Sequence, residues 1–200
     1  MTLPSDIKLT SEMLWQGTLV FALIDLGFVS LLAWRIRPAR FRQLKWALVG
    51  TTAIFWSSLW AWVLSWGWDS VYSYVFPGWI RPWLPLLQGL HFAVVALVFW
   101  WSALRLPNPV AGFCLFGGLW GMVTHAWAVY WGIVDKPPML QGASPVAAVV
   151  IAIFEFMFYW CIILSVAWLL WRAWQRFCAM TCMHRRNATP CSRSGTELEA

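Results

Sequence analysis

Apolar residues run almost without interruption through five stretches of the chain, and charged or proline-rich segments separate these stretches. An α-helix that crosses the ~30 Å hydrocarbon core of a bilayer needs about 20 mostly apolar residues, and each stretch reaches that length. They cover residues 13–34, 46–66, 83–104, 110–133 and 146–171. The pattern predicts an all-α fold in which a bundle of five transmembrane helices occupies residues 1–172. Residues 173–200 would form a basic cytosolic tail that we expect to be disordered.

The composition agrees with a protein that crosses the membrane several times. Of the 200 residues, 61% are hydrophobic and 11% are charged, and the mean hydropathy is +0.65. A soluble domain has about 45–50% apolar and about 25% charged residues. The first apolar stretch is too long for a cleaved signal peptide and is followed by Arg35 and Arg37 instead of a cleavage site, so it should stay in the membrane. We expect a multi-pass protein of the endoplasmic reticulum in a eukaryote, or of the inner membrane in a bacterium.

The distribution of basic residues predicts the orientation of the bundle, because short cytosolic loops collect Lys and Arg. Most of the 14 basic residues fall on one side, namely Arg35, Arg37, Arg40, Arg42, Lys45, Arg105, Arg172, Arg176, Arg185, Arg186 and Arg193. The other side carries Lys8, Arg81 and Lys136. The N-terminus is therefore expected outside or in a lumen, and the C-terminus in the cytosol. Anionic lipid headgroups also account for the net charge of +6, so no nucleic-acid partner is expected.

The chain contains 19 tryptophans, and many lie away from the membrane interfaces where this residue usually anchors a helix. The deeper ones are Trp56, Trp60, Trp100, Trp101, Trp120, Trp127, Trp160 and Trp168. Such rings either pack tightly between helices or line a cavity for a flat apolar ligand. The sequence leaves both interpretations open.

Four side chains within the predicted spans can exchange a proton: Asp25, His91, His125 and Glu155. A charge at the bilayer centre costs ~2.5–3.5 kcal/mol, so such residues usually face the interior of a bundle. At ~1.5 Å per residue, the two histidines and Glu155 lie about 12–14 Å from the predicted outer helix ends, and Asp25 lies about one turn deeper. We therefore expect these groups to converge in one dry chamber. The residues expected to line this chamber and contact a substrate are Gln88, Trp120, Trp127 and Tyr159.

Such a chamber would suit acid–base catalysis on a lipophilic substrate. Glu155 would donate a proton to a carbon–carbon double bond or an epoxide, while His91 or His125 accepts a proton elsewhere. Asp25 and the faces of the aromatic rings would stabilise the positive charge that develops, the rings by up to ~2 kcal/mol. This chemistry isomerises or cyclises a flat lipid such as a sterol or an isoprenoid, and it needs no metal or cofactor.

Two other functions remain open. His91 and His125, on neighbouring antiparallel helices at matching depth, could be the axial ligands of a b-type haem in an electron-transfer protein. Alternatively, Glu155 only helps to hold helices together, and the protein is a scaffold or assembly subunit that binds a membrane-protein partner or a second copy of itself.

The layout of the last three predicted helices resembles the emopamil-binding-protein (EXPERA) family of membrane sterol isomerases. The segments that carry the resemblance are "LLQGLHFAVVALVFWW", "GLWGMVTHAWAVYWGIVD" and "AIFEFMFYWCIIL". The resemblance implies that His91 and Glu155 occupy positions of proton-handling or cation-stabilising groups. The chain departs from the family at residues 46–66. The family has acid–base residues there, whereas this span has no ionisable residue and its polar side chains are those of Thr51, Thr52, Ser57, Ser58 and Ser65.

The five cysteines have neither the spacing of a metal site nor that of a disulfide framework. Cys114 and Cys161 lie within predicted spans. Cys178, Cys182 and Cys191 lie on the predicted cytosolic side, where thiols usually stay reduced. Cys178 and Cys182 lie next to the predicted membrane boundary, so reversible acylation of these two residues in a eukaryote stays open.

Overall fold

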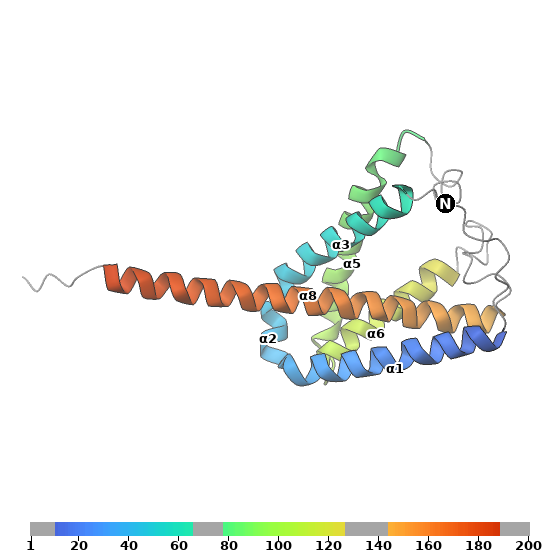
Figure 1. Cartoon of the computed structure of the whole chain (residues 1–200), viewed down its shortest axis with the longest axis horizontal. Coiled ribbons are helices and arrows are strands. Elements are labelled where there is room, and N and C mark those ends of the chain that lie inside the picture. The colour runs from blue at the N-terminus through green and yellow to red at the C-terminus, as the bar shows by residue number, and fades with distance from the viewer. Residues whose placement is uncertain (1–10, 66–77, 127–143, 189–200) are drawn as a thin grey trace, which may run out of the picture.

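The computed structural model describes residues 11–65, 78–126 and 144–188 (Figure 1). Its helices are α1 (Ser11–Arg35), α2 (Pro38–Gln43), α3 (Lys45–Ser65), η1 (Arg81–Trp83), α5 (Leu84–Ala103), α6 (Pro109–Gly121), η2 (Met122–Ala126) and α8 (Pro145–Ala188). No strand occurs in these three ranges. The prediction of an all-α fold is therefore confirmed.

Four helical segments are long and apolar enough to cross a membrane: Thr18–Arg35, Lys45–Ser65, Arg81–Ala103 and Val146–Thr181. Each coincides with a predicted span. The remaining predicted span, 110–133, is represented by the shorter apolar helix Pro109–Thr124, and its residues 127–133 lie beyond the described residues. The structure thus supports an integral membrane protein with four candidate spans.

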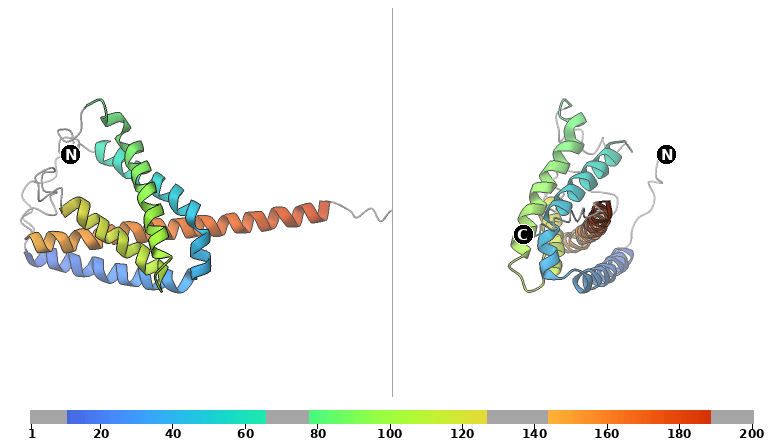
Figure 2. Two further views of the ribbon diagram at one scale, coloured as in Figure 1. Left: turned by 180° about the vertical axis from the view of Figure 1, so that it is seen from behind. Right: turned by 90° about the vertical axis from the view of Figure 1, so that its left-hand side faces the viewer.

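Helix α8 is the axis around which the other helices are arranged (Figures 1 and 2). It packs against α1 on one side and against α3 on the other, and α6 lies along it. Helices α3 and α5 form the closest pair of neighbours and cross α8 at an angle. The core of the protein therefore lies where α3, α5 and α6 meet α8.

A row of glycines lets α6 approach α8 closely. A Cβ atom on Gly117 would overlap the indole ring of Trp160, and one on Gly121 would overlap the ring of Phe156. Gly118 likewise faces the backbone and side chains of α8. Small residues at this spacing allow helices to pack tightly in lipid, where the hydrophobic effect does not hold helices together. As the numbers rise along α6 they fall along α8, so the two helices are antiparallel.

Aromatic rings fill the core beside this row of glycines. The Trp56 ring stacks on Phe92 with ring centroids 3.9 Å apart and lies 5.6 Å from Phe156. Trp160 is fully buried. Its ring centroid lies 5.2 Å from that of Phe99, and the ring makes further edge contacts. The indole nitrogens of Trp56 and Trp160 have no hydrogen-bond partner within the described ranges. At these two positions, the tryptophans pack between helices.

The connection between α5 and α6 shows how local sequence sets a helix start. Asn108 has an extended backbone, its Oδ1 accepts a hydrogen bond from the Ala111 N–H at 3.1 Å, and Pro109 occupies the first helical position. An Asn cap satisfies a backbone donor that would otherwise lack a partner, and proline needs no donor there.

We expect Asn108→Ala to destabilise the fold by about 1 kcal/mol, because it removes this cap. Asn108→Asp keeps an oxygen acceptor and should be close to wild type. Unfolding of the purified protein by sodium dodecyl sulfate in mixed micelles, followed by circular dichroism, measures both. Equal stabilities of the two variants would contradict the cap.

Two helical segments differ from the sequence-based expectation. The predicted first cytosolic loop, residues 35–45, contains α2, which begins with Pro38 at a position where proline is favourable. Helix α8 continues to Ala188, past the predicted end at 171. Residues 172–188 contain no Gly or Pro, so nothing in the sequence interrupts the helix when its apolar character declines. Residues 189–200 of the predicted tail lie outside the described residues.

Candidate functional site

Glu155 and Tyr159 form a hydrogen-bonded pair on one face of α8. The Tyr159 hydroxyl donates to Glu155 Oε1 at 2.8 Å, and both side chains are partly buried. The Tyr159 ring lies 5.9 Å from both Phe55 and Trp56 of α3. A carboxyl group and a phenol are therefore held one helical turn apart, beside the aromatic rings between α3 and α8.

His91 lies on α5 and is exposed at the surface of the described residues. Its ring lies 5.2 Å from Phe92 and 6.0 Å from Trp120 of α6. Gln88, one turn before His91, is partly buried, as is Trp120. Gln88 and Trp120, two of the predicted lining residues, therefore lie near His91.

His125 lies in the π-helical turn η2 that follows α6. Within this turn the Thr124 hydroxyl donates to the backbone oxygens of Trp120 at 3.0 Å and Gly121 at 3.3 Å. The side chain of His125 and all of Trp127 lie outside the described residues. A π-helical turn has wider spacing than an α-helix, so positions after Gly121 do not continue the face of α6.

Asp25 is fully buried on α1, a helix that packs against α6 and α8. Neither carboxyl oxygen has a hydrogen-bond partner in the part of the chain that the structure describes. Phe158 of α8 faces the same helix, with its ring 6.0 Å from Phe21. Tyr159, the partner of Glu155, instead faces α3. No hydrogen bond among the described residues joins Asp25 to Glu155.

The structure therefore brings together some of the predicted site residues. It pairs Glu155 with Tyr159, and His91 with Trp120. No direct hydrogen bond or ring contact among the described residues joins these two pairs, but the stacked rings of Trp56 and Phe92 lie between Tyr159 and His91. In the same ranges, no three His, Cys, Asp or Glu side chains form a group that could hold a metal ion. Because the His125 side chain is not described, convergence of all four groups in one chamber stays a prediction.

The sequence analysis missed a contact between two thiols. Cys161 Sγ lies 3.6 Å from Cys114 Sγ, and both side chains are fully buried. The two residues are far apart in the sequence and no motif links them. Only the antiparallel packing of α6 on α8 brings them together.

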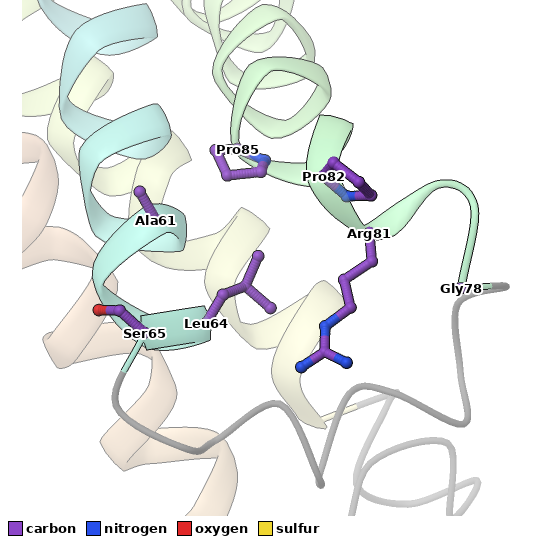
Figure 3. A pocket seen from close by; sticks show the side chains of 7 residues that line it. All are labelled: Ala61, Leu64, Ser65, Gly78, Arg81, Pro82 and Pro85. Atoms are coloured by element: carbon purple, nitrogen blue, oxygen red, sulfur yellow. The ribbon is translucent and has the colours of Figure 1, made fainter.

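A shallow, open depression of about 510 Å³ lies between the end of α3 and the start of α5 (Figure 3). Its lining is mostly apolar and includes one basic side chain, that of Arg81, which extends toward the end of α3. The lining residues are Ala61, Leu64, Ser65, Gly78, Arg81, Pro82 and Pro85. Neither Glu155 nor His91 lines it.

Comparison of the chain with protein-family models, with curated proteins and with solved structures finds no match.

Proposed function

We propose that the chain is a membrane-embedded acid–base enzyme that isomerises or cyclises a flat unsaturated lipid such as a sterol or an isoprenoid, with Glu155 as the proton donor. The observation that carries this proposal is the hydrogen bond from Tyr159 to Glu155 beside the rings of Phe55 and Trp56. It supplies a proton donor, a group that stabilises the conjugate base, and aromatic faces in one region of the bundle.

Each of these groups has a role in the proposed reaction. The protonated Glu155 carboxyl transfers its proton to one carbon of a double bond, which leaves a carbocation on the other carbon. The resulting carboxylate accepts the Tyr159 O–H···O bond, and a hydrogen bond to an ionised acceptor is stronger than one to a neutral acceptor. The aromatic faces stabilise the cation. Loss of a proton from the neighbouring carbon to His91 or His125 then gives a shifted double bond.

The proposal also includes the number of spans and the orientation of the protein in the membrane. We place five spans in the bilayer, with α6, η2 and the residues that follow completing the fifth, the N-terminus outside and the C-terminus in the cytosol. This orientation is supported by the basic residues of α2 and of the end of α8, which include Arg40, Arg42, Arg172 and Arg176. All of them fall on the side that the proposal places in the cytosol, where basic residues collect. The substrate would enter from the lipid bilayer.

The test compares lipid extracts from cells that produce the wild-type chain, Glu155→Gln or Tyr159→Phe. If Glu155 is the donor, Glu155→Gln should lower formation of the isomerised sterol or isoprenoid by on the order of 10²-fold or more, since an amide cannot supply the proton. Tyr159→Phe should have a smaller effect, about tenfold, because only the support of the carboxylate is lost. Growth in D₂O should place one deuterium from solvent in the product.

Thr181→Ala is a matched control, since Thr181 is exposed at the far end of the same helix. It should leave the lipid profile unchanged. A sterol and isoprenoid profile that is the same in wild-type and Glu155→Gln cells would contradict catalysis. A Soret absorption band in the purified protein that disappears in His91→Ala and His125→Ala would instead favour the haem-binding function.

A further inference from the structure

Three buried side chains from three different helices form a polar cluster in the core: Asp25 of α1, Cys114 of α6 and Cys161 of α8. All three are 0% exposed. The two thiols are in contact, with 3.6 Å between their sulfur atoms, and Asp25 is close enough to Cys114 to interact with it electrostatically. No hydrogen bond among the described residues joins this acid–dithiol cluster to the Glu155–Tyr159 pair.

Packing alone does not account for Asp25 at this position. A buried carboxyl without a hydrogen bond costs several kcal/mol, whereas a leucine of similar size would cost nothing there. Neither of its oxygens has such a partner among the described residues. Ionisable residues inside membrane bundles generally act in proton or ion transfer. The Cys114 thiol, with which Asp25 interacts electrostatically, is a group that can exchange a proton with it.

We propose that Cys114 and Cys161 form a redox-active dithiol that hydrogen peroxide oxidises to a disulfide, with Asp25 as the proton acceptor for Cys114. In the first step the Cys114 thiol gives its proton to the Asp25 carboxylate and its sulfur attacks one peroxide oxygen. The O–O bond breaks, Cys114 becomes a sulfenic acid, and the proton passes from Asp25 to the leaving hydroxide to give water.

The second step closes the disulfide. Cys161 sulfur attacks the sulfenic sulfur of Cys114, the S–O bond breaks, and the departing hydroxide takes the Cys161 thiol proton to leave as a second water. In total, two thiols and one peroxide give one disulfide and two waters, so the sulfurs lose the two electrons that the peroxide gains. No other reactant is needed.

The geometry suits this reaction. A disulfide bond is about 2.05 Å long, so the two sulfur atoms must approach by only ~1.5 Å, which side-chain movement supplies without separating the helices. The new bond would join α6 to α8 in line with Gly117 and Gly118, where the helices already pack tightly. Because the cluster is fully buried in apolar surroundings, a small uncharged oxidant is the one best suited to reach it.

The test treats the full-length protein in isolated membranes with hydrogen peroxide, blocks free thiols with an alkylating reagent after denaturation, and maps the cysteines by mass spectrometry. We expect a peptide pair joined through Cys114 and Cys161, two mass units lighter than the reduced pair. Cys178, which is less buried, is the internal reference for peroxide exposure. Full alkylation of Cys114 and Cys161 at peroxide concentrations that oxidise Cys178 would overturn the proposal.

Two single-cysteine variants test the order of the steps. In Cys161→Ser the sulfenic acid on Cys114 cannot be resolved, so it should accumulate and react with dimedone that is present while the protein is denatured. In Cys114→Ser, no carboxylate is assigned to Cys161 as its proton acceptor. Dimedone should therefore label Cys161 in this variant at least tenfold less than it labels Cys114 in Cys161→Ser. Equal labelling in the two variants would contradict the role of Cys114 as the attacking residue.

Asp25→Asn tests the proton acceptor, because it keeps the shape of the side chain but takes no proton. Formation of the disulfide should become on the order of 10²-fold slower. Thr51→Val, which changes a buried polar side chain of α3 outside the cluster, should leave the rate unchanged. A wild-type rate in Asp25→Asn would overturn the role of Asp25. The labelling of Cys161→Ser by dimedone decides the dithiol chemistry even where Asp25→Asn does not fold.

Discussion

Replacing Gly117 with valine should destabilise the protein by about 3 kcal/mol or more, a large effect for one added side chain. The first added carbon would already overlap the indole ring of Trp160. That ring is fully buried and is held by Phe99 and Phe113, whose ring centroids lie 5.2 and 5.4 Å away. It cannot move aside without disturbing these neighbours, so α6 would have to move away from α8.

The matched control is Gly50→Val on α3. A Cβ atom on Gly50 meets nothing within 4 Å, so this variant adds the same side chain without a collision. Its stability should stay within about 0.5 kcal/mol of wild type, since valine is a somewhat better helix residue than glycine. Both variants are measured by unfolding with sodium dodecyl sulfate in mixed micelles. Similar losses at the two glycines would mean that α6 does not pack on α8 through Gly117.

The hydrophobic pattern was sufficient to predict the helices but not their ends. The helices around residues 13–34, 46–66 and 83–104 follow from long apolar stretches that charges or prolines interrupt, as at Arg35 and Pro107. The end of α8 could not be predicted in this way, because the apolar character declines after Leu170 while helix-forming residues continue. Hydropathy indicates where a helix leaves the lipid, whereas the helix propensity of the residues determines where the helix ends.

The candidate site was most directly predictable where its residues lie on one helix. Glu155 and Tyr159 are four residues apart, and this spacing places them on the same face of any α-helix. The contact of Cys114 with Cys161 depends on the register of α6 against α8, which no local pattern encodes. The π-helical turn at Met122–Ala126 also changes the spacing on which the placement of His125 relied.

Replacing Trp56 with alanine should cost ~3–5 kcal/mol, the range for removing a large buried aromatic side chain. Trp56 is 4% exposed and its ring stacks on Phe92 of α5 while it lies near Phe156 of α8, so it contacts two helices at once. Its indole nitrogen has no hydrogen-bond partner in the described residues. The loss would therefore come from ring packing alone, and Trp56→Phe should recover part of it.

Trp46→Ala is the matched control, because Trp46 lies on the same helix with 73% of its surface exposed. Its ring contacts the Lys45 ammonium group, 4.8 Å from the ring centroid, and an exposed cation–π contact is worth about 0.5–1 kcal/mol. The cost of Trp46→Ala should not exceed that value. A double-mutant cycle of Trp56→Ala with Phe92→Ala should give a coupling free energy of about 0.5–1.5 kcal/mol. A coupling of zero would show that the two rings do not stack, and the aromatic core between α3, α5 and α8 would then need a different arrangement.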